Sequence, residues 1–321
     1  MAIFTMLIGL PGSGKTTLAN ALMACASKPT ALLSSDAIRE ELWGDANNQK
    51  NPGKVFEVMK NRAIEYLDMG WDVIYDATNI VAKQRKSTLA AIRNAVDEDF
   101  IAKCVFVSCP LSECKRRQGD RDRKVPIEVI DRMARQFEAP WYNEGWGQIS
   151  IAYGSANKQN IDREHWRMLG ESHDNPHHTA SLEMHCALCD SNMRQAAEKE
   201  PRVGKEAYHM LAEAAYQHDL GKHKTKAFFD TKGNPTDIAH YYGHNNVGAY
   251  LWLTGDKARE WTEAEFLYIA LLIQWHMQPF FCRDTEGNYR KNFENWCEKR
   301  GFDEIFCEDI IMLHEADKEA H

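Results

Sequence analysis

Histidine is missing from the first half of this 321-residue chain, because none of its 13 histidines precedes His165. Charge divides at about the same place. Residues 1–152 carry 20 lysines and arginines against 19 acidic residues, whereas residues 153–321 carry 19 against 28. A chain of this length already favours about two domains. The two compositions therefore predict two domains with different chemistry.

Long apolar runs are also missing, and none approaches the roughly 18 residues that a membrane span needs. The opening MAIFTMLIGLPG has no basic segment and leads straight into a glycine-rich loop, so we expect a cytoplasmic protein without a membrane partner. The nine cysteines follow no regular spacing, which favours reduced thiols. The net charge of −8 excludes a broadly basic nucleic-acid binder, but it permits a local basic groove.

The clearest motif follows the apolar run at residues 3–8. It reads GLPGSGKT over residues 9–16, and apolar residues at helical spacing come next. This strand–GxxxxGK[ST]–helix order is that of a P-loop, whose backbone N–H groups surround phosphates. Lys15 is expected to reach the β- and γ-phosphates, and the Thr16 hydroxyl to hold Mg²⁺. The sequence therefore predicts phosphate binding here.

Short apolar runs alternate with amphipathic segments as far as residue 153. We expect strands at 3–8, 30–34, 71–75, 101–108 and 148–153, and helices at 36–43, 55–67, 84–95 and 126–137. This alternation predicts an α/β domain over residues 1–153, with helices on both faces of a parallel sheet. Ligands of such sheets bind at the carboxyl ends of the strands, which places Asp36 and Asp76 beside the phosphates.

A carboxylate–guanidinium pair and a basic segment indicate phosphoryl transfer to a hydroxyl group. Asp36 and Arg39 lie three residues apart, so one helix face presents a base for a hydroxyl proton and a cation for a phosphate. Residues 115–124 are rich in lysine and arginine and fall between an expected strand and helix. A loop in that position can close over a transferring phosphoryl group. A capping aspartate and a solvated charged loop are the alternatives.

Residues 1–150 resemble the kinase domain of phage-type polynucleotide 5′-kinases. The matching segments are GLPGSGKTT (9–17), SSDAIRE (34–40), DATN (76–79) and KRRQGDRDRKVPIEVI (115–130). The resemblance implies Mg²⁺- and ATP-dependent phosphorylation of 5′-hydroxyl ends. By it, Asp36 is the general base, and Arg39 grips the phosphate beside the acceptor hydroxyl. Asp76 is grouped with the acceptor side and orients lid or metal waters, and Arg116 and Arg121 contact ATP from a lid. The implied ATP-binding residues are Gly9, Gly12, Ser13, Gly14, Lys15, Thr16, Thr17, Arg116 and Arg121, with Lys15, Arg39 and Arg121 assisting catalysis.

The second half reads as a mainly helical domain. Residues 154–164 are small and polar and predict a linker, and residues 165–321 then form the domain. We expect helices at about 179–198, 206–220, 244–254, 263–276 and 303–319, and no strands.

Several polar residues of this domain occupy apolar helix faces. His218 continues the stripe of Leu211 and Ala215, and Asp317 continues that of Ile310 and Leu313. A single histidine on such a face is usually a hydrogen-bonded core residue, but a buried carboxylate must be paired or bind metal. Imidazoles and carboxylates from several helices that converge on a divalent metal would explain the whole set.

Residues 173–320 resemble the HD phosphohydrolase superfamily. The matching segments are HHTASLEMHCALC (177–189), HDLGK (218–222), YYGHNNVGAY (241–250), LLIQWHM (271–277) and LHEADKEA (313–320). By this resemblance, His185, His218, Asp219 and Asp317 hold one divalent metal. His244 and His276 would complete a second, with Asp219 bridging, and Lys222 would contact phosphate. Mn²⁺, Ni²⁺, Co²⁺ and Mg²⁺ are the candidate ions, and a single-metal site remains open.

Together the two resemblances imply a bifunctional enzyme that heals RNA ends. The first domain would phosphorylate 5′-hydroxyl ends, and the second would remove 2′,3′-cyclic, 2′- or 3′-phosphates. RNA, or alternatively DNA, would be the substrate, and a separate RNA ligase is expected as a pathway partner because no adenylation lysine motif is evident. Two alternatives remain: a small-metabolite kinase fused to an HD nucleotidase, and a kinase with a non-catalytic regulatory HD module.

Overall fold

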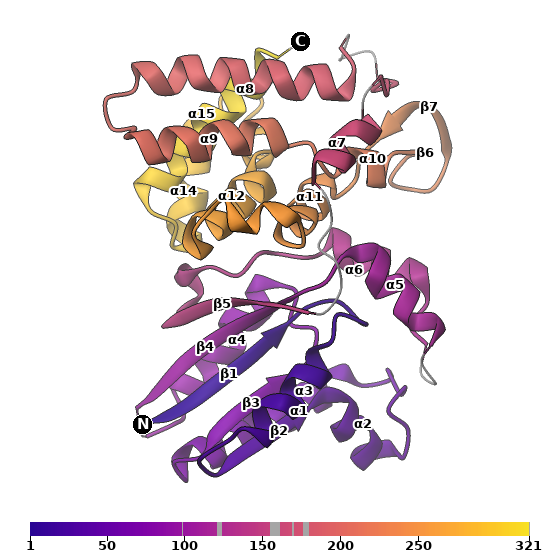
Figure 1. Cartoon of the computed structure of the whole chain (residues 1–321), viewed down its shortest axis with the longest axis vertical. Helices are drawn as coiled ribbons and strands as arrows, with labels where there is room; N and C mark the ends of the chain where they lie inside the picture. Colours follow the sequence, from indigo (N-terminus) through magenta and orange to yellow (C-terminus); the bar gives the residue numbers. More distant parts are fainter. Residues whose placement is uncertain (98, 121–123, 155–160, 169, 176–179, 321) are drawn as a thin grey trace. The chain divides into compact units, whose positions relative to one another are not determined.

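The structure is a computed structural model that describes residues 1–97, 99–120, 124–154, 161–168, 170–175 and 180–320. The chain forms two compact units (Figure 1). The first comprises Met1–Met133 and Pro140–Asn157, and the second comprises Ala134–Ala139 and Lys158–His321. Within the described part of the chain, no helix has the length and apolar character needed to cross a membrane.

The first unit is built on a five-stranded sheet (Figure 1). Its strands are β1 (Ala2–Ile8), β2 (Thr30–Ser34), β3 (Asp72–Asp76), β4 (Phe100–Ser108) and β5 (Gln148–Tyr153). They lie in the order β2-β3-β1-β4-β5, and every neighbouring pair is parallel. The parallel α/β fold expected from the alternating pattern is therefore confirmed.

Helices connect these strands. They are α1 (Lys15–Ala24), α2 (Ser35–Trp43), α3 (Pro52–Asp68), α4 (Ala82–Arg93), α5 (Leu111–Gly119), α6 (Ile127–Arg135) and the 3₁₀ helix η1 (Tyr142–Glu144). Right-handed crossovers in this strand order place α1 on one face of the sheet and α3 and α4 on the other. Helices on both faces explain why central strand β1 buries Phe4, Met6, Leu7 and Ile8 completely.

The DATN segment fixes the end of the central strand. Asn79 adopts a left-handed φ of 47°, which asparagine tolerates better than most residues, and its Nδ2 donates to the Leu7 carbonyl over 2.8 Å. The buried Arg85 guanidinium donates to the Asn79 carbonyl over 2.9 Å and to the Glu144 carboxylate. These contacts hold the loop after β3 against the loop after β1, where the P-loop begins.

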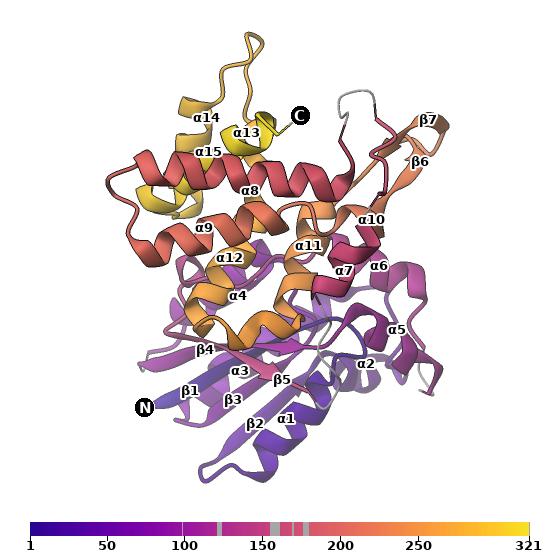
Figure 2. The same cartoon turned by 45° about the horizontal axis from the view of Figure 1, so that its top comes forward.

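The second unit is mainly helical. Its helices are α7 (Ile161–Met168), α8 (Leu182–Lys199), α9 (Lys205–Gln217), α10 (Lys222–Thr225), α11 (His244–Leu253), η2 (Asp256–Arg259), α12 (Glu263–Trp275), α13 (Gln278–Phe281), α14 (Arg290–Arg300) and α15 (Glu304–Lys318). Helix α12 is buried along nearly its whole length and is apolar on all sides, as a core helix should be. Figure 2 shows α8 and α9 side by side, as their contacts also indicate.

Two elements of this half were not expected, a hairpin and helix α14. The unit contains an antiparallel hairpin of β6 (Ala227–Phe229) and β7 (Pro235–His240), although no strand was expected. Its turn forms because the Asp230 carboxylate accepts the backbone N–H groups of Lys232 and Asn234.

The division between the two units at residues 157 and 158 falls within the expected linker at 154–164. Helix α7 begins at Ile161, inside that segment. The short stretch Ala134–Ala139 belongs to the second unit, where the Phe137 and Tyr250 rings meet edge to face at 5.1 Å. Helix α14 was not expected, because its residues are mostly polar and exposed.

Candidate functional site

The loop between β1 and α1 has the conformation that phosphate binding requires. Gly12 and Gly14 adopt φ of 87° and 103°, a region that favours glycine. A Cβ on Gly12 would lie 2.6 Å from the Cys114 carbonyl oxygen, so no side chain fits there. The Gly9 N–H donates to the Thr78 carbonyl over 3.0 Å and closes the loop. The backbone is thus curled at the N-terminus of α1, where anions bind.

Two P-loop side chains already have defined partners. The Lys15 ammonium donates to the Leu10 carbonyl of the same loop over 2.9 Å, and the residue is 8% exposed. The Thr16 hydroxyl donates to Asp76 Oδ2 over 2.8 Å. Asp76 ends β3, next to β1, and is buried. The structure therefore places Asp76 beside the residue expected to hold Mg²⁺.

A cavity of about 1160 Å³ opens in front of the P-loop within the first unit. Its lining includes the predicted Gly12, Ser13, Gly14, Lys15, Thr16, Thr17, Asp36, Arg39 and Asp76. Asp36 and Arg39 lie on the first turns of α2, where Arg39 Nη1 donates to Asp36 Oδ1 over 2.9 Å. The Arg39 side chain is 8% exposed and that of Asp36 50%. A nearly buried guanidinium therefore orients a carboxylate that faces the cavity.

The two adjacent arginines of the basic segment, Arg116 and Arg117, lie differently in the structure. Arg116 does not line the cavity; its side chain is 63% exposed and pairs with Glu113 and Asp120. Its neighbour Arg117 lines the cavity and donates to the Gly12 carbonyl over 3.0 Å. Adjacent residues of a helix point about 100° apart, so only one of the two can face the P-loop. Arg121 lies outside the described residues.

Glu113 holds both of these arginines. It accepts bonds from Arg116 Nε and Arg117 Nε, each over 2.7 Å. The Arg116 guanidinium, helped by that of Arg117, lowers the pKa of Glu113 to about 2. Lys124 and Arg132 also line the cavity and add positive charge. Sequence reasoning missed Arg117, Lys124 and Arg132 as individuals, although it identified the basic segment.

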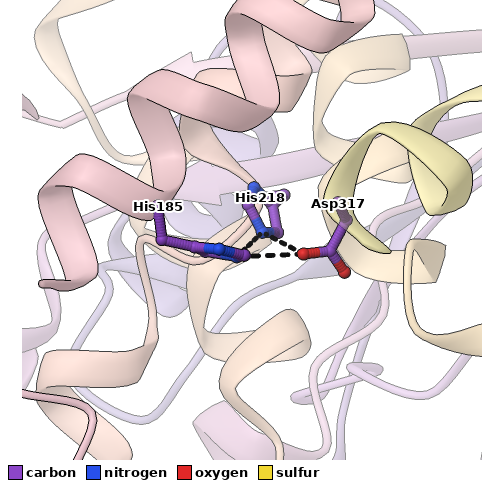
Figure 3. Close-up of side chains that lie close together, drawn as sticks. All are labelled: His185, His218 and Asp317. Atoms are coloured by element: carbon purple, nitrogen blue, oxygen red, sulfur yellow. Dashed lines mark hydrogen bonds and ion pairs between the residues drawn. The ribbon is translucent and has the colours of Figure 1, made fainter. Parts of the chain in front are cut away.

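In the second unit, six predicted residues from five elements converge. His185 lies on α8, His218 and Asp219 follow α9, His244 begins α11, His276 follows α12, and Asp317 lies on α15. Figure 3 shows the side chains of His185, His218 and Asp317 pointing toward one another. Both His185–His218–Asp317 and His218–Asp219–His276 lie close enough to share a metal ion.

The four histidines of this cluster are held in the same way. Nδ1 of His185, His218, His244 and His276 lies 2.7, 2.7, 2.9 and 2.7 Å from a backbone carbonyl oxygen. A carbonyl can only accept, so each Nδ1 carries a proton and each Nε2 faces the other members of the cluster. Metal-ligating histidines are typically oriented by such a bond to the other ring nitrogen.

Asp219 lies between two pairs of histidines. Its Oδ2 is 3.4 Å from His185 Nε2 and 3.3 Å from His218 Nε2, and its Oδ1 is 3.3 Å from His244 Nε2 and 3.9 Å from His276 Nε2. Asp317 Oδ1 joins the first pair at 2.9 and 3.3 Å. Nitrogen and oxygen ligands about 2.1 Å from a metal are separated by about 3.0–3.4 Å. The separations of His185 and His218 from Asp219 Oδ2 and Asp317 Oδ1 lie close to this range, whereas the 3.9 Å between His276 Nε2 and Asp219 Oδ1 lies outside it.

Electrostatics favour ionised carboxylates in this cluster. Burial opposes the charge on Asp219, but His218 and Lys222 hold the pKa of its carboxyl well below the usual range. Burial, with the charges of His218 and His244, lowers the pKa of His276 to about 3. Lys222 Nζ lies 2.6 Å from Asp219 Oδ2, so its partner in this structure is the cluster itself. Anionic oxygens with a neutral imidazole are a donor set for divalent transition metals.

Comparisons with known proteins find relatives of the first unit. Residues 4–140 match the AAA domain family. The L-seryl-tRNA(Sec) kinase of Methanococcus maripaludis is 26% identical over 162 residues, 48% of this chain and 59% of that protein. The adenylyl-sulfate kinase of Paraburkholderia xenovorans is 31% identical over 144 residues, 41% of this chain and 75% of that protein. The match thus spans less than two thirds of the seryl-tRNA kinase.

A solved structure described as the Pnkp1/Rnl/Hen1 complex contains a similar chain. The match has a TM-score of 0.32 at 22% identity, and it covers 36% of this chain and 38% of that chain.

The parallel sheet, the P-loop and the curated relatives define the class of the first unit: it is a P-loop kinase-like, nucleotide-binding domain. Such a fold implies ATP and Mg²⁺ as cofactors. Through the region that matches the adenylyl-sulfate kinase, the chain belongs to the P-loop kinases.

Proposed function

We propose that the protein heals RNA ends: its first unit phosphorylates a 5′-hydroxyl with ATP, and its second removes 2′,3′-cyclic, 2′- or 3′-phosphates. One observation carries this proposal. A single chain holds a P-loop cavity with a carboxylate–guanidinium pair on its wall and a cluster of six histidines and aspartates that contains two overlapping groups able to hold a metal ion. Transfer to a hydroxyl and hydrolysis of a phosphoester are the chemistries these two sites suit.

In the kinase step, the acceptor oxygen forms a bond to the γ-phosphorus of ATP while the bond to the β-phosphate oxygen breaks, which leaves ADP. Asp36 takes the hydroxyl proton, and Arg39 keeps its carboxylate oriented and attracts the acceptor's own phosphate. Lys15 and Arg117 offset charge on the transferring group, and Thr16 with Asp76 lies where Mg²⁺ binds.

In the second unit, His185, His218, Asp219 and Asp317 would hold one divalent ion, and His244 and His276 with Asp219 a second. Bound divalent ions would supply an activated water and offset phosphoryl charge. The chain keeps each imidazole in the Nδ1–H form through its carbonyl partner, so that Nε2 can coordinate. Lys222 would move from Asp219 to the substrate phosphate once metal charge replaces its own.

A separate RNA ligase is the expected partner, because a ligase joins a 5′-phosphate to a 3′-hydroxyl.

The proposed function is tested by comparing the activity of each unit on different substrates. The kinase should phosphorylate a 5′-hydroxyl oligoribonucleotide with a far higher kcat/KM than adenylyl sulfate or a nucleoside. The reverse preference would favour the small-metabolite kinase instead. Metal-loaded protein that hydrolyses neither cyclic phosphates nor an aryl phosphate, with the kinase active, would indicate a regulatory second unit.

A further inference from the structure

Arg283 lies in the loop that follows α13, against helix α15. Figure 2 shows α13 close to α15, as their contacts also indicate. Arg283 Nη2 lies 3.3 Å from His314 Nε2, and the guanidinium lies over the Phe280 ring, 4.7 Å from the ring centroid. Arg283 is exposed, whereas His314 is buried. Two side chains from different elements therefore hold one face and one N–H of a solvent-facing cation.

The partners of Arg283 leave its positive charge uncompensated. A guanidinium can only donate, so His314 Nε2 accepts and the imidazole is neutral. In the part of the chain that the structure describes, no carboxylate is paired with Arg283. The adjacent Asp284 accepts two backbone N–H groups of its own loop, and Glu315 accepts the Tyr289 hydroxyl. A held cation without an acidic partner is suited to bind an anion from outside.

The His314 ring is itself incompletely bonded. Because Nε2 accepts from Arg283, the ring proton lies on Nδ1, and this buried Nδ1 has no hydrogen-bond partner among the described residues. Buried donors without a partner are rare in proteins. The Tyr289 ring packs edge to face against the imidazole, with centroids 5.0 Å apart. The ring is thus fixed by packing, and its one hydrogen bond goes to the arginine.

The histidine–aspartate cluster lies one turn of α15 away from this contact. His314 precedes Asp317 by three residues, so their Cβ atoms are about 5–6 Å apart on the same side of the helix. Figure 3 shows Asp317 pointing toward His185 and His218. The Asp317 side chain is 20% exposed, whereas the other five side chains of the cluster are 9% exposed or less. The cluster is therefore most open to solvent on the side of α15 where Arg283 lies.

A cation in this position suits a phosphate beside the reacting one. Lys222 already lies within the cluster, where its Nζ pairs with Asp219. Arg283 is displaced from Asp317 by a helical turn, so it would meet the next phosphate along a strand. A guanidinium binds phosphate oxygens through two parallel N–H···O bonds. A polynucleotide carries such a second phosphate at its last internucleotide link, and a small phosphoester carries none.

We propose that Arg283 binds the internucleotide phosphate next to the RNA end that lies at the histidine–aspartate cluster. This inference rests on the proposed function of the second unit. It gives that unit a reason to prefer a polynucleotide to a small phosphoester, because only a polynucleotide occupies the cluster and Arg283 together.

Binding of a product RNA at several salt concentrations tests this assignment in the full chain. The probe is an oligoribonucleotide with a 3′-hydroxyl and a 5′-fluorescein, which neither unit can convert, in the presence of Mn²⁺. One phosphate contact on a single strand contributes about 0.7 to the slope of log K against log salt. Arg283→Ala should reduce the slope by about that amount and weaken binding about tenfold at low salt. Arg283→Lys, which keeps the charge, should keep the slope.

Kinetics on two substrates separate this role from damage to the cluster. For an oligoribonucleotide with a 3′-phosphate and a 5′-fluorescein, Arg283→Ala should raise KM about tenfold. Hydrolysis of a generic aryl phosphate, which has no second phosphate, should be unchanged. Equal losses on the two substrates would overturn the inference, because Arg283 would then act on the reacting phosphate or on the fold of the cluster.

Arg194→Ala is the matched control. Arg194 also lies over an aromatic ring, that of Tyr208, but it is paired with Asp190. It comes nine residues after His185 on α8, about 13.5 Å along the helix. Its removal should change neither the salt slope nor KM.

An unchanged slope in Arg283→Ala, or an equal reduction in Arg194→Ala, would also overturn the assignment of Arg283. If the wild type hydrolyses neither substrate, the proposed function fails. The salt slope of RNA binding then still decides whether Arg283 contacts a phosphate, since that measurement requires no turnover.

Discussion

His244 Nε2 and His276 Nε2 face each other at 3.2 Å, while Nδ1 of each ring donates to the carbonyl three residues earlier in the chain. Two ring nitrogens with outward lone pairs at this distance repel unless a cation lies between them or beside them. The carbonyl bonds prevent either ring from turning its N–H toward the other without losing a buried partner. The fold thus holds Nε2 of both rings close together next to Asp219.

Divalent metal should stabilise the second unit. An ion that binds only the folded cluster adds about 2.7 kcal/mol when its free concentration is 100 times its Kd. Thermal unfolding with Mn²⁺, Ni²⁺ or a chelator measures this effect, and elemental analysis gives the stoichiometry. His276→Ala should lose one bound ion and part of the stabilisation, whereas His209→Ala, an exposed histidine of α9, should lose neither. Identical unfolding with metal and with chelator would contradict the metal assignment.

Asp36→Asn should abolish most 5′-phosphorylation while ATP still binds, because the amide cannot accept the hydroxyl proton. A general base contributes about 10²–10⁴ in rate, so kcat should fall by that order. Binding of a fluorescent ATP analogue should change less than threefold, on the order of 0.5 kcal/mol. Glu57→Gln removes an exposed carboxylate of α3 that does not line the cavity, and it should keep full activity. An Asp36→Asn enzyme with near-normal turnover would show that another group accepts the proton.

Arg117→Ala and Arg116→Ala provide a matched pair on adjacent residues of α5. Arg117 contacts the Gly12 carbonyl and lines the cavity, so its loss should weaken ATP binding and lower kcat by about tenfold or more. Arg116 is largely exposed, and exposed ion pairs contribute only about 0–1 kcal/mol. Its removal should therefore leave kinase kinetics within about twofold. ATP-dependent kinetics of both variants decide the matter, and a larger defect in Arg116→Ala would reverse the assignment.

Glu164 should stabilise the second unit near neutral pH, and this stabilisation should be lost in acid. Burial opposes its charge, but His223, Lys224 and Arg167 outweigh burial and lower the pKa of the Glu164 carboxyl to about 2. A folded-state pKa below the unfolded one stabilises the protein above about pH 4.5, and this stabilisation is lost as the pH falls toward 2. The shift corresponds to at most about 3 kcal/mol.

Urea unfolding of Glu164→Gln across this range tests that linkage. The variant should be less stable than the wild type near neutral pH, and the gap should close between about pH 4.5 and 2. Glu206→Gln, on an exposed first-turn residue of α9, should follow the wild-type curve. Parallel curves for wild type and Glu164→Gln would mean that the ion pairs around Glu164 do not stabilise the fold.

Local patterns sufficed to predict the sheet and the P-loop. Buried parallel strands read as continuous apolar runs, and Gly12, Lys15 and Thr16 form a motif whose parts are adjacent in sequence. Helical stripes likewise indicated that His218 and Asp317 face the interior, and the structure brings them together with His185.

Features that depend on tertiary contacts could not be predicted from local sequence patterns. Choosing Arg117 over Arg116 requires the rotation of α5 against the P-loop, which composition does not contain. The hairpin was missed because β6 has three residues and its stability depends on the Asp230 turn and on packing against residues far along the chain. The carbonyl partners of the histidines are backbone atoms and carry no residue signal.

The central claim is that one chain converts both ends of a cleaved RNA. The direct measurement incubates the protein with ATP, Mg²⁺, and Mn²⁺ or Ni²⁺, and an RNA that has a 5′-hydroxyl and a 2′,3′-cyclic phosphate, and it follows both ends. The account predicts a 5′-phosphate and a free 3′-hydroxyl, with Asp36→Ala blocking only the 5′ reaction and Asp219→Ala only the 3′ reaction. A cyclic phosphate that survives while the 5′ end is phosphorylated, or a 5′-hydroxyl that survives throughout, would contradict it.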